Sequence, residues 1–112
     1  MRPIKILDIV EQLPDRDLLK AIAWKIPDDK DFPEGIKYAF AYIHKGKRIL
    51  GYDNEKAKGH HKHIVDLQTG KEMQIKIEFK DMLSLFEKFK SEVYKLKDEI
   101  YGGKNESKKD TD

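Results

Sequence analysis

The stretch Y-A-F-A-Y-I-H-K-G-K-R-I-L-G-Y, residues 38–52, decides the fold class of this chain. Aromatic side chains at Tyr38, Phe40 and Tyr42 alternate with smaller residues, which is the two-residue period of a strand with one buried face. The Lys-Gly-Lys segment at 45–47 is typical of a tight turn, and a second apolar run follows it. The stretch therefore predicts a β-hairpin. Its aromatic stripe is interpreted as core, with a stacking platform for bases as the alternative.

Short apolar runs bounded by turn residues continue on both sides of this hairpin. Four more strands are predicted, at residues 4–13, 18–26, 61–67 and 73–77. Strands that follow one another over short turns favour an antiparallel sheet.

From about Lys80 onward, the spacing of the apolar residues changes from that of a strand to that of a helix. Apolar residues recur every three or four positions between Met82 and Ile100, which predicts an amphipathic helix. No Ser, Thr or Asn stands just before this series, so the N-cap is expected to be weak. We predict an α+β fold, a twisted antiparallel β-sheet packed against one C-terminal amphipathic helix. One domain is expected over residues 1–101, with a disordered polar tail over 102–112.

Composition excludes several classes of protein. The 112 residues contain no cysteine, which rules out disulfides and thiolate metal sites, and no apolar stretch approaches the length of a membrane span. The net charge of +2 is too small to indicate a nucleic-acid binder by itself. We expect a cytoplasmic protein without membrane association. The high content of Lys, Glu and Ile is typical of thermophile proteins.

The histidines are the most informative polar residues, because all four lie between His44 and His63. His61 and His63 are two positions apart on a predicted strand, so both imidazoles should project from one face. Asp53 closes the preceding strand and is expected to pair with one of them. Such a carboxylate–imidazole pair supports general acid–base catalysis.

Neighbouring residues would suit phosphodiester chemistry. Lys58 or Lys62 could neutralise a phosphate, and Tyr52 offers a hydroxyl group or a stacking ring. A metal-independent ribonuclease needs a base, an acid and a cation, all of which this set supplies without a cofactor. Two alternatives stay open, a solvated loop whose histidines are surface residues and a transition-metal site built from His-x-His and a carboxylate.

The same segment carries a family resemblance. G-Y-D-N-E at 51–55, followed by K-G-H-H-K-H at 58–63, resembles the G-Y-D-N-x(n)-G-x-H-x-H signature of the TumE-like toxins of type II toxin–antitoxin systems. The W-K-I-P segment at 24–27, the aromatic strand at 38–43 and the helical stretch at 79–93 are similar to the flanks of that signature. The resemblance covers residues 15–101. His60 and His61 both stand where the first histidine of the signature is expected.

The resemblance implies a growth-inhibiting toxin that is neutralised by a cognate helix-turn-helix antitoxin, with RNA as the expected substrate. An endoribonuclease with catalytic Asp53, His61 and His63 and no metal or cofactor is the leading hypothesis. Substrate contacts are expected from Tyr52, Asn54, Lys58 and Lys62, although Asn54 could instead cap the turn. The alternatives are a non-catalytic RNA- or protein-binding module and a histidine-rich metal-binding protein. The sequence does not fix the oligomeric state, and a dimer is compatible with it.

Overall fold

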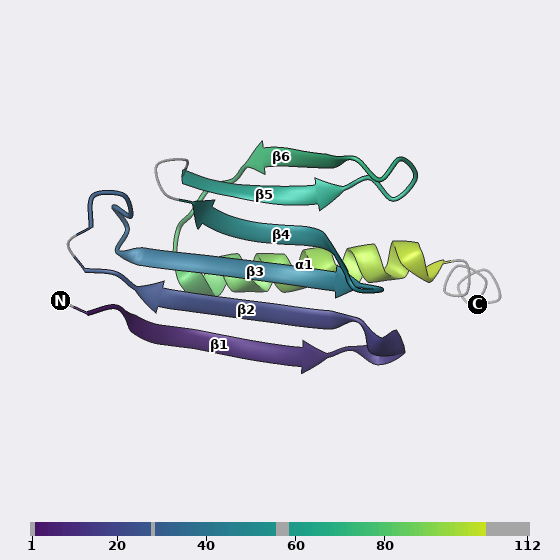
Figure 1. The fold of residues 1–112 in the computed structure, drawn as a ribbon, viewed down its shortest axis with the longest axis horizontal. Helices are drawn as coiled ribbons and strands as arrows, with labels where there is room; N and C mark the ends of the chain where they lie inside the picture. Colours follow the sequence, from purple (N-terminus) through teal and green to yellow (C-terminus); the bar gives the residue numbers. More distant parts are fainter. Residues whose placement is uncertain (1, 28, 56–58, 103–112) are drawn as a thin grey trace. The chain divides into compact units, whose positions relative to one another are not determined.

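A computed structural model describes residues 2–27, 29–55 and 59–102 of the chain (Figure 1). In the described part of the chain, six strands precede one α-helix, and a short 3₁₀ helix, η1 (Pro14–Arg16), lies between the first two strands, which confirms the predicted α+β class. The strands are β1 (Ile4–Gln12), β2 (Leu18–Lys25), β3 (Ile36–His44), β4 (Lys47–Glu55), β5 (Gly59–Val65) and β6 (Glu72–Lys76), and the helix is α1 (Met82–Ile100).

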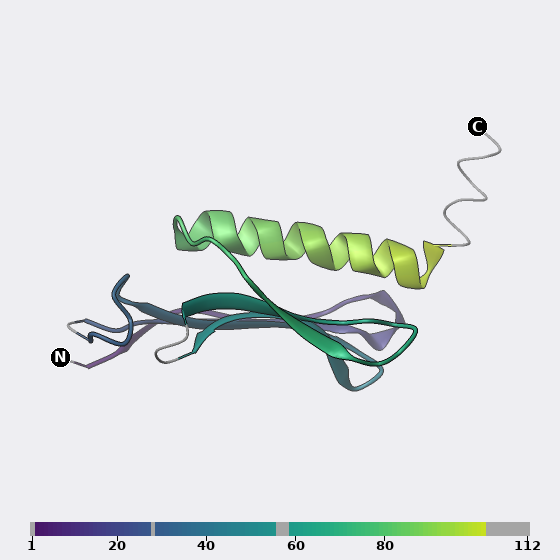
Figure 2. The same cartoon turned by 90° about the horizontal axis from the view of Figure 1, so that it is seen from above.

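The six strands form one antiparallel sheet in which spatial order follows chain order, from β1 to β6. Seen from above, they lie in a single twisted layer (Figure 2). Contacts divide the chain into two compact units, residues 1–78 with the sheet and residues 79–112 with the helix. The expectation of one domain over 1–101 stays a prediction. The predicted disordered tail lies, apart from Gly102, outside the described residues.

The hairpin of β3 and β4 is the element that the sequence predicted most directly. Its turn consists of Lys45 and Gly46, which have positive φ angles of 51° and 77°, as a two-residue hairpin turn requires. Tyr42 lies opposite Leu50 and Ile43 opposite Arg48, so Ile49 is an extra residue in β4. This bulge changes the face on which the Arg48 side chain lies relative to strict alternation.

Alternation along the strands gives the sheet two distinct faces. We call one the buried face, because it carries the apolar core that the sequence predicted, including Leu19, Tyr38, Phe40, Tyr42, Leu50 and Tyr52. The other we call the open face, since its strand centres carry exposed or half-buried residues, including Lys20, Ile22, Trp24, Lys37, Ala39 and Ala41. Register places Asp53, His61 and His63 on the open face.

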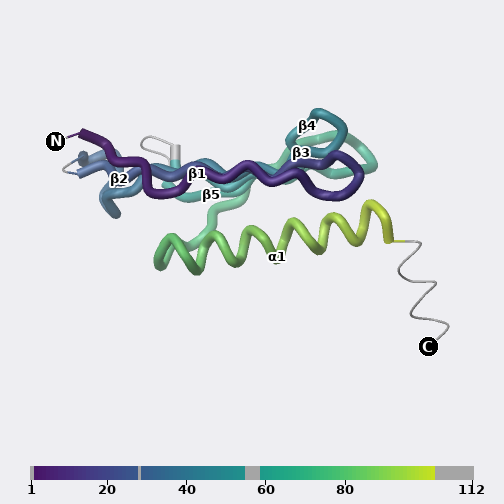
Figure 3. Tube along the Cα trace, turned by 90° about the horizontal axis from the view of Figure 1, so that it is seen from below, coloured from purple at the N-terminus to yellow at the C-terminus, as the bar shows by residue number. Residues whose placement is uncertain are grey.

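The helix α1 is unbroken from Met82 to Ile100 (Figure 3). Its buried residues recur every three or four positions, as the apolar spacing predicted: Leu85, Phe89, Val93 and Leu96. The expectation of a weak N-cap was wrong. The Asp81 side chain accepts a hydrogen bond from the Ser84 amide at 2.7 Å, and aspartate caps as well as serine or asparagine. Within the described residues no helix is both long and apolar enough to span a membrane.

Candidate functional site

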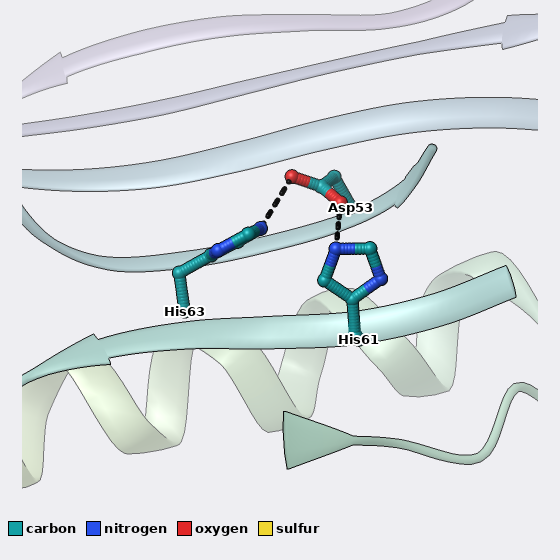
Figure 4. Close-up of side chains that lie close together, drawn as sticks. All are labelled: Asp53, His61 and His63. Carbon is teal, nitrogen blue, oxygen red and sulfur yellow. Dashed lines mark hydrogen bonds and ion pairs between the residues drawn. The ribbon is translucent and has the colours of Figure 1, made fainter. Parts of the chain in front are cut away.

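Asp53, His61 and His63 form one compact cluster, as the sequence predicted from their strand positions. Asp53 lies directly opposite His61 in the β4–β5 ladder, and His63 lies opposite Gly51, two residues before Asp53. Both imidazoles reach toward the carboxylate, each toward a different oxygen (Figure 4). His61 Nε2 is 3.1 Å from Asp53 Oδ1, and His63 Nε2 is 3.1 Å from Asp53 Oδ2.

The cluster is shielded from solvent although it lies on the open face. His61 and His63 are each 5% exposed, and the Asp53 side chain is 16% exposed. The two imidazole rings meet edge to face, with centroids 4.7 Å apart. Buried polar groups of this kind need hydrogen-bond partners, because the unpaired group loses its interaction with water.

The hydrogen bonds of the cluster are incomplete. His61 Nδ1 is 3.1 Å from the Gly59 carbonyl oxygen and donates to it, because a carbonyl can only accept. His63 Nε2 bonds to Asp53. Among the described residues, three buried side-chain atoms have no hydrogen-bond partner: Asp53 Oδ1, His61 Nε2 and His63 Nδ1. All three belong to this cluster, which distinguishes it from the other polar groups of the fold.

Two charged residues that sequence reasoning missed extend the cluster along the open face. Glu72 of β6 places Oε1 3.6 Å from His63 Nδ1, and its other oxygen accepts from Arg48 Nη2 at 3.1 Å. The Arg48 side chain crosses over Gly51, whose missing Cβ would stand 3.1 Å from Arg48 Cδ. Arg48 takes this position because of the bulge at Ile49, which the sequence pattern did not reveal.

A lysine also lies next to the cluster. Lys76 is directly opposite His61 in the β5–β6 ladder, so both side chains project from the same face. A pocket of about 320 Å³ is lined by His61, Gln74, Ile75 and Lys76. His61 is therefore the histidine of the cluster that borders a cavity.

The structure does not bring the other sequence-predicted residues to this cluster. Tyr52, Asn54 and Lys62 alternate with Asp53 and His61 along their strands, and register places them on the opposite face of the sheet. Tyr52 is fully buried. Lys58 lies outside the described residues.

Asn54 bonds to the backbone of β3. Its Oδ1 accepts from the Tyr38 amide at 2.9 Å, and its Nδ2 donates to the Ile36 carbonyl at 2.6 Å. Through these two hydrogen bonds, the Asn54 side chain joins β4 to β3 just beyond the last paired residues of the two strands. This is a strand-joining role, close to the capping alternative that the sequence left open.

His60 belongs to a second cluster, on the buried face. Its Nδ1 is 3.0 Å from the Tyr38 hydroxyl and its Nε2 is 3.1 Å from Glu34 Oε1. Burial raises the pKa of the Tyr38 hydroxyl, and the carboxylates of Asp53 and Glu34 raise that pKa further. Tyr38 therefore keeps its proton, and its hydroxyl donates to His60 Nδ1 in the tautomer whose Nε2–H faces Glu34. A pocket of about 430 Å³ lies alongside, lined by Lys30, Asp31, Pro33, Glu34, Asn54, Gly59 and His60.

His44 forms a third carboxylate–histidine pair. Its Nδ1 is 2.9 Å from Asp17 Oδ1, and the Tyr42 hydroxyl donates to the other oxygen of Asp17 at 2.8 Å. Asp17 is only 1% exposed, and both of its oxygens are bonded. This pair is a satisfied structural group, in contrast to the cluster at Asp53.

The Asp53 cluster can support two kinds of chemistry. A carboxylate between two imidazoles orients both rings and stabilises a protonated one, as acid–base catalysis requires. One ligand atom from each of Asp53, His61 and His63 also lies within 4.8 Å of the others, which is a set that can hold a metal ion.

Comparisons with known proteins agree with the resemblance carried by the sequence motif. The family model described as toxin TumE matches residues 7–97, which include the whole sheet except the start of β1, together with most of α1. No curated protein and no solved structure gives a significant match to the chain.

Proposed function

The chain belongs to the TumE toxin family, and from this premise we propose that it is a toxin that cleaves RNA at the cluster of Asp53, His61 and His63. One observation carries the assignment of the site. Every buried side-chain atom without a hydrogen-bond partner, among the described residues, belongs to these three side chains. Unsatisfied buried groups cost stability, so a fold retains them where chemistry needs them.

The proposed mechanism is acid–base cleavage without a metal, as expected from the sequence. One histidine takes the proton of the ribose 2′-hydroxyl and the other protonates the leaving oxygen. Asp53 bonds to His63 Nε2 through one oxygen and places its other oxygen 3.1 Å from His61 Nε2, so its charge stabilises whichever ring carries the extra proton. His61 borders the pocket beside β6, which gives a substrate its approach to the cluster.

The cation beside the phosphate is assigned to Lys76. Lys58 and Lys62 were expected in this role from the sequence, but Lys62 projects from the other face and Lys58 lies outside the described residues. Lys76 is exposed, lies opposite His61 and lines the same pocket. Its ammonium group can reach a phosphoryl oxygen and stabilise the charge that develops on it.

The open face offers a path for the RNA strand toward the cluster. Lys20 and Lys37 are exposed on it, and Trp24 is half-buried opposite Lys37. On β3, which lies between the strands of Trp24 and Asp53, the small side chain of Ala39 stands directly opposite Asp53. Lysines that bind phosphates beside an aromatic ring that stacks on a base are the usual elements of single-strand binding.

A toxin family implies an antitoxin as partner. We assign this role to a helix-turn-helix protein, on the family resemblance of the sequence, and place the toxin's action on RNA in the cytoplasm. A neutralising partner could act by covering the open face, since that would separate the cluster from RNA.

Cleavage of labelled cellular RNA by purified protein tests the proposal. Wild type should cleave in the presence of EDTA, and His61→Ala/His63→Ala should not. His60→Gln is the matched control, because His60 is adjacent in sequence but bonds to Tyr38 and Glu34 on the other face. Circular dichroism must show that each variant is folded.

Two outcomes would contradict the proposal. If folded His61→Ala/His63→Ala still cleaved RNA, the assignment of the catalytic site to these histidines would be wrong. Absence of cleavage by every protein, together with RNA binding that weakens steeply with salt, would identify a non-catalytic RNA-binding module instead.

A further inference from the structure

We propose that Asp53, His61 and His63 bind one divalent transition-metal ion, with the Nε2 atoms of both imidazoles and the Asp53 carboxylate as its ligands. The inference concerns binding, and it stands whether or not the protein cleaves RNA. It rests on hydrogen-bond polarity, on ligand spacing and on the groups behind each ligand.

The polarity of the His61 contacts is the first argument. Because the Gly59 carbonyl accepts from Nδ1–H, the Nε2 atom of a neutral His61 carries a lone pair rather than a proton. That lone pair faces Asp53 Oδ1 at 3.1 Å, and neither atom has a hydrogen-bond partner. Two acceptors that face each other in a buried site repel, and a cation between them converts repulsion into two bonds.

The surroundings of His63 also allow its Nε2 atom to act as a metal ligand, although this atom bonds to Asp53 Oδ2 in the metal-free protein. Its Nδ1 lies 3.6 Å from Glu72 Oε1, just beyond hydrogen-bond distance, so Glu72 is the acceptor nearest to this atom. Metal binding would move the ring proton of His63 from Nε2 to Nδ1, where it faces Glu72, and Nε2 would then present its lone pair beside Asp53. Both histidines would thus have a backbone or carboxylate acceptor behind the ligand atom, the usual arrangement for metal-binding imidazoles.

Additional protons would satisfy the unpaired buried atoms of the cluster less well than one metal ion would. A proton on each of the two orphaned nitrogens, His61 Nε2 and His63 Nδ1, would charge both imidazoles, whose centroids are only 4.7 Å apart. Two adjacent imidazolium rings repel in a buried site. One metal ion would leave both rings neutral and place its charge against the carboxylates of Asp53 and Glu72.

The spacing of the ligand atoms also fits. Metal–ligand bonds of about 2.0–2.2 Å place neighbouring ligand atoms about 3–3.5 Å apart around one ion. Each imidazole Nε2 is 3.1 Å from a carboxylate oxygen, which matches this range. One atom from each residue lies within 4.8 Å of the others, so the three ligands would have to draw closer together around an ion. Three protein ligands leave coordination positions free toward the pocket beside His61.

The donor set narrows the choice of metal. Two imidazoles and one carboxylate suit Zn²⁺, Mn²⁺, Fe²⁺, Co²⁺ or Ni²⁺, whereas Mg²⁺ and Ca²⁺ prefer oxygen ligands throughout. We therefore expect tight binding of Zn²⁺ and Co²⁺ and weak binding of Mg²⁺.

The test is a titration of EDTA-treated, desalted protein with Zn²⁺ and Co²⁺, without RNA. Calorimetry should give one ion per chain, and Co²⁺ should develop visible absorption of a four- or five-coordinate site. His61→Gln and His63→Gln should each weaken binding at least about 100-fold, and Glu72→Gln about 10-fold through the outer shell. His60→Gln should bind as wild type does.

A second measurement keeps the inference falsifiable if a variant fails to fold. In wild type, NMR of the imidazole rings should show that Zn²⁺ attaches at Nε2 of His61 and His63 and that both Nδ1 atoms carry a proton in the metal-bound protein. Binding that persists in folded His61→Gln/His63→Gln, or ring spectra unchanged by stoichiometric Zn²⁺, would overturn the proposal. Neither result depends on whether RNA is cleaved.

Discussion

Asp53 lies directly opposite His61 in the β4–β5 ladder, and its Oδ1 faces the Nε2 of that histidine at 3.1 Å without a hydrogen bond. This relationship follows from the register of two strands and from the Gly59 carbonyl that fixes the proton on His61 Nδ1. We therefore expect the cluster to favour a bound cation and to lower the stability of the metal-free fold.

Replacing Asp53 with asparagine should raise the stability of the metal-free protein and at the same time abolish RNA cleavage and Zn²⁺ binding. The amide group introduced by Asp53→Asn could donate to His61 Nε2 and accept from His63 Nε2–H, so that each of these contacts has a donor and an acceptor. We expect the metal-free variant to gain about 1 kcal/mol in free energy of unfolding and to lose RNA cleavage and Zn²⁺ binding. Urea unfolding in EDTA measures the first effect. A variant less stable than wild type would contradict the acceptor–acceptor contact.

Metal and acid–base cleavage should compete, because both use the lone pairs of the same imidazoles. If both proposals hold, stoichiometric Zn²⁺ inhibits cleavage of labelled RNA and EDTA restores it. His60→Gln should show the same response as wild type. Loss of cleavage on adding EDTA would instead replace the metal-free mechanism with metal-assisted hydrolysis at the same residues.

Gly51 is expected to be required for the position of Arg48. A Cβ atom in Gly51→Ala would stand 3.1 Å from Arg48 Cδ and displace the side chain that bonds to Glu72. Since that ion pair is exposed, the free energy of unfolding should fall by no more than about 1 kcal/mol. The double variant Arg48→Ala/Gly51→Ala should show a smaller combined loss than the sum of the single changes. Additive losses in urea unfolding would contradict the contact.

Replacing Asn54 should lower the stability of the fold but leave the affinity of the cluster for Zn²⁺ almost unchanged. Asn54→Ala leaves the Tyr38 amide and the Ile36 carbonyl without their side-chain partner, so we expect a loss of about 2–4 kcal/mol. Zn²⁺ affinity, measured on the folded fraction, should stay close to that of wild type. A large loss of affinity in a protein of unchanged stability would assign Asn54 to the site instead.

The Asp81 cap predicts a dependence of helix stability on pH. Hydrogen bonds from Ser84 lower the pKa of the Asp81 carboxyl below its ordinary value of 3.8. A carboxyl whose pKa is lower in the folded state stabilises the fold above its unfolded pKa, and this contribution disappears as the pH falls through the folded pKa. Asp81→Ala should therefore melt earlier than wild type at neutral pH, and the difference should shrink in strong acid. Asp81→Asn keeps a capping side chain and should lose less at neutral pH.

Much of the fold could be predicted from local sequence. Alternation at Tyr38, Phe40 and Tyr42, the Lys45-Gly46 turn and the apolar spacing of the helix each reflect backbone geometry that acts within a few residues. The same alternation predicted that His61 and His63 share a face. Asp81 directly precedes the helix and fits the same local reasoning, because aspartate is among the preferred N-cap residues.

The sequence by itself determined the strands, the helix and the identity of the Asp53, His61 and His63 set, because side-chain period and chain order suffice for these. Only the tertiary structure decided which neighbours join that set. The bulge at Ile49 brings Arg48 over Gly51, and pairing of β5 with β6 brings Glu72 and Lys76 beside the histidines. Register between strands depends on contacts summed over the whole ladder, and a shift of one residue reverses the face of every side chain. The same register places Tyr52, Asn54 and Lys62 on the opposite face.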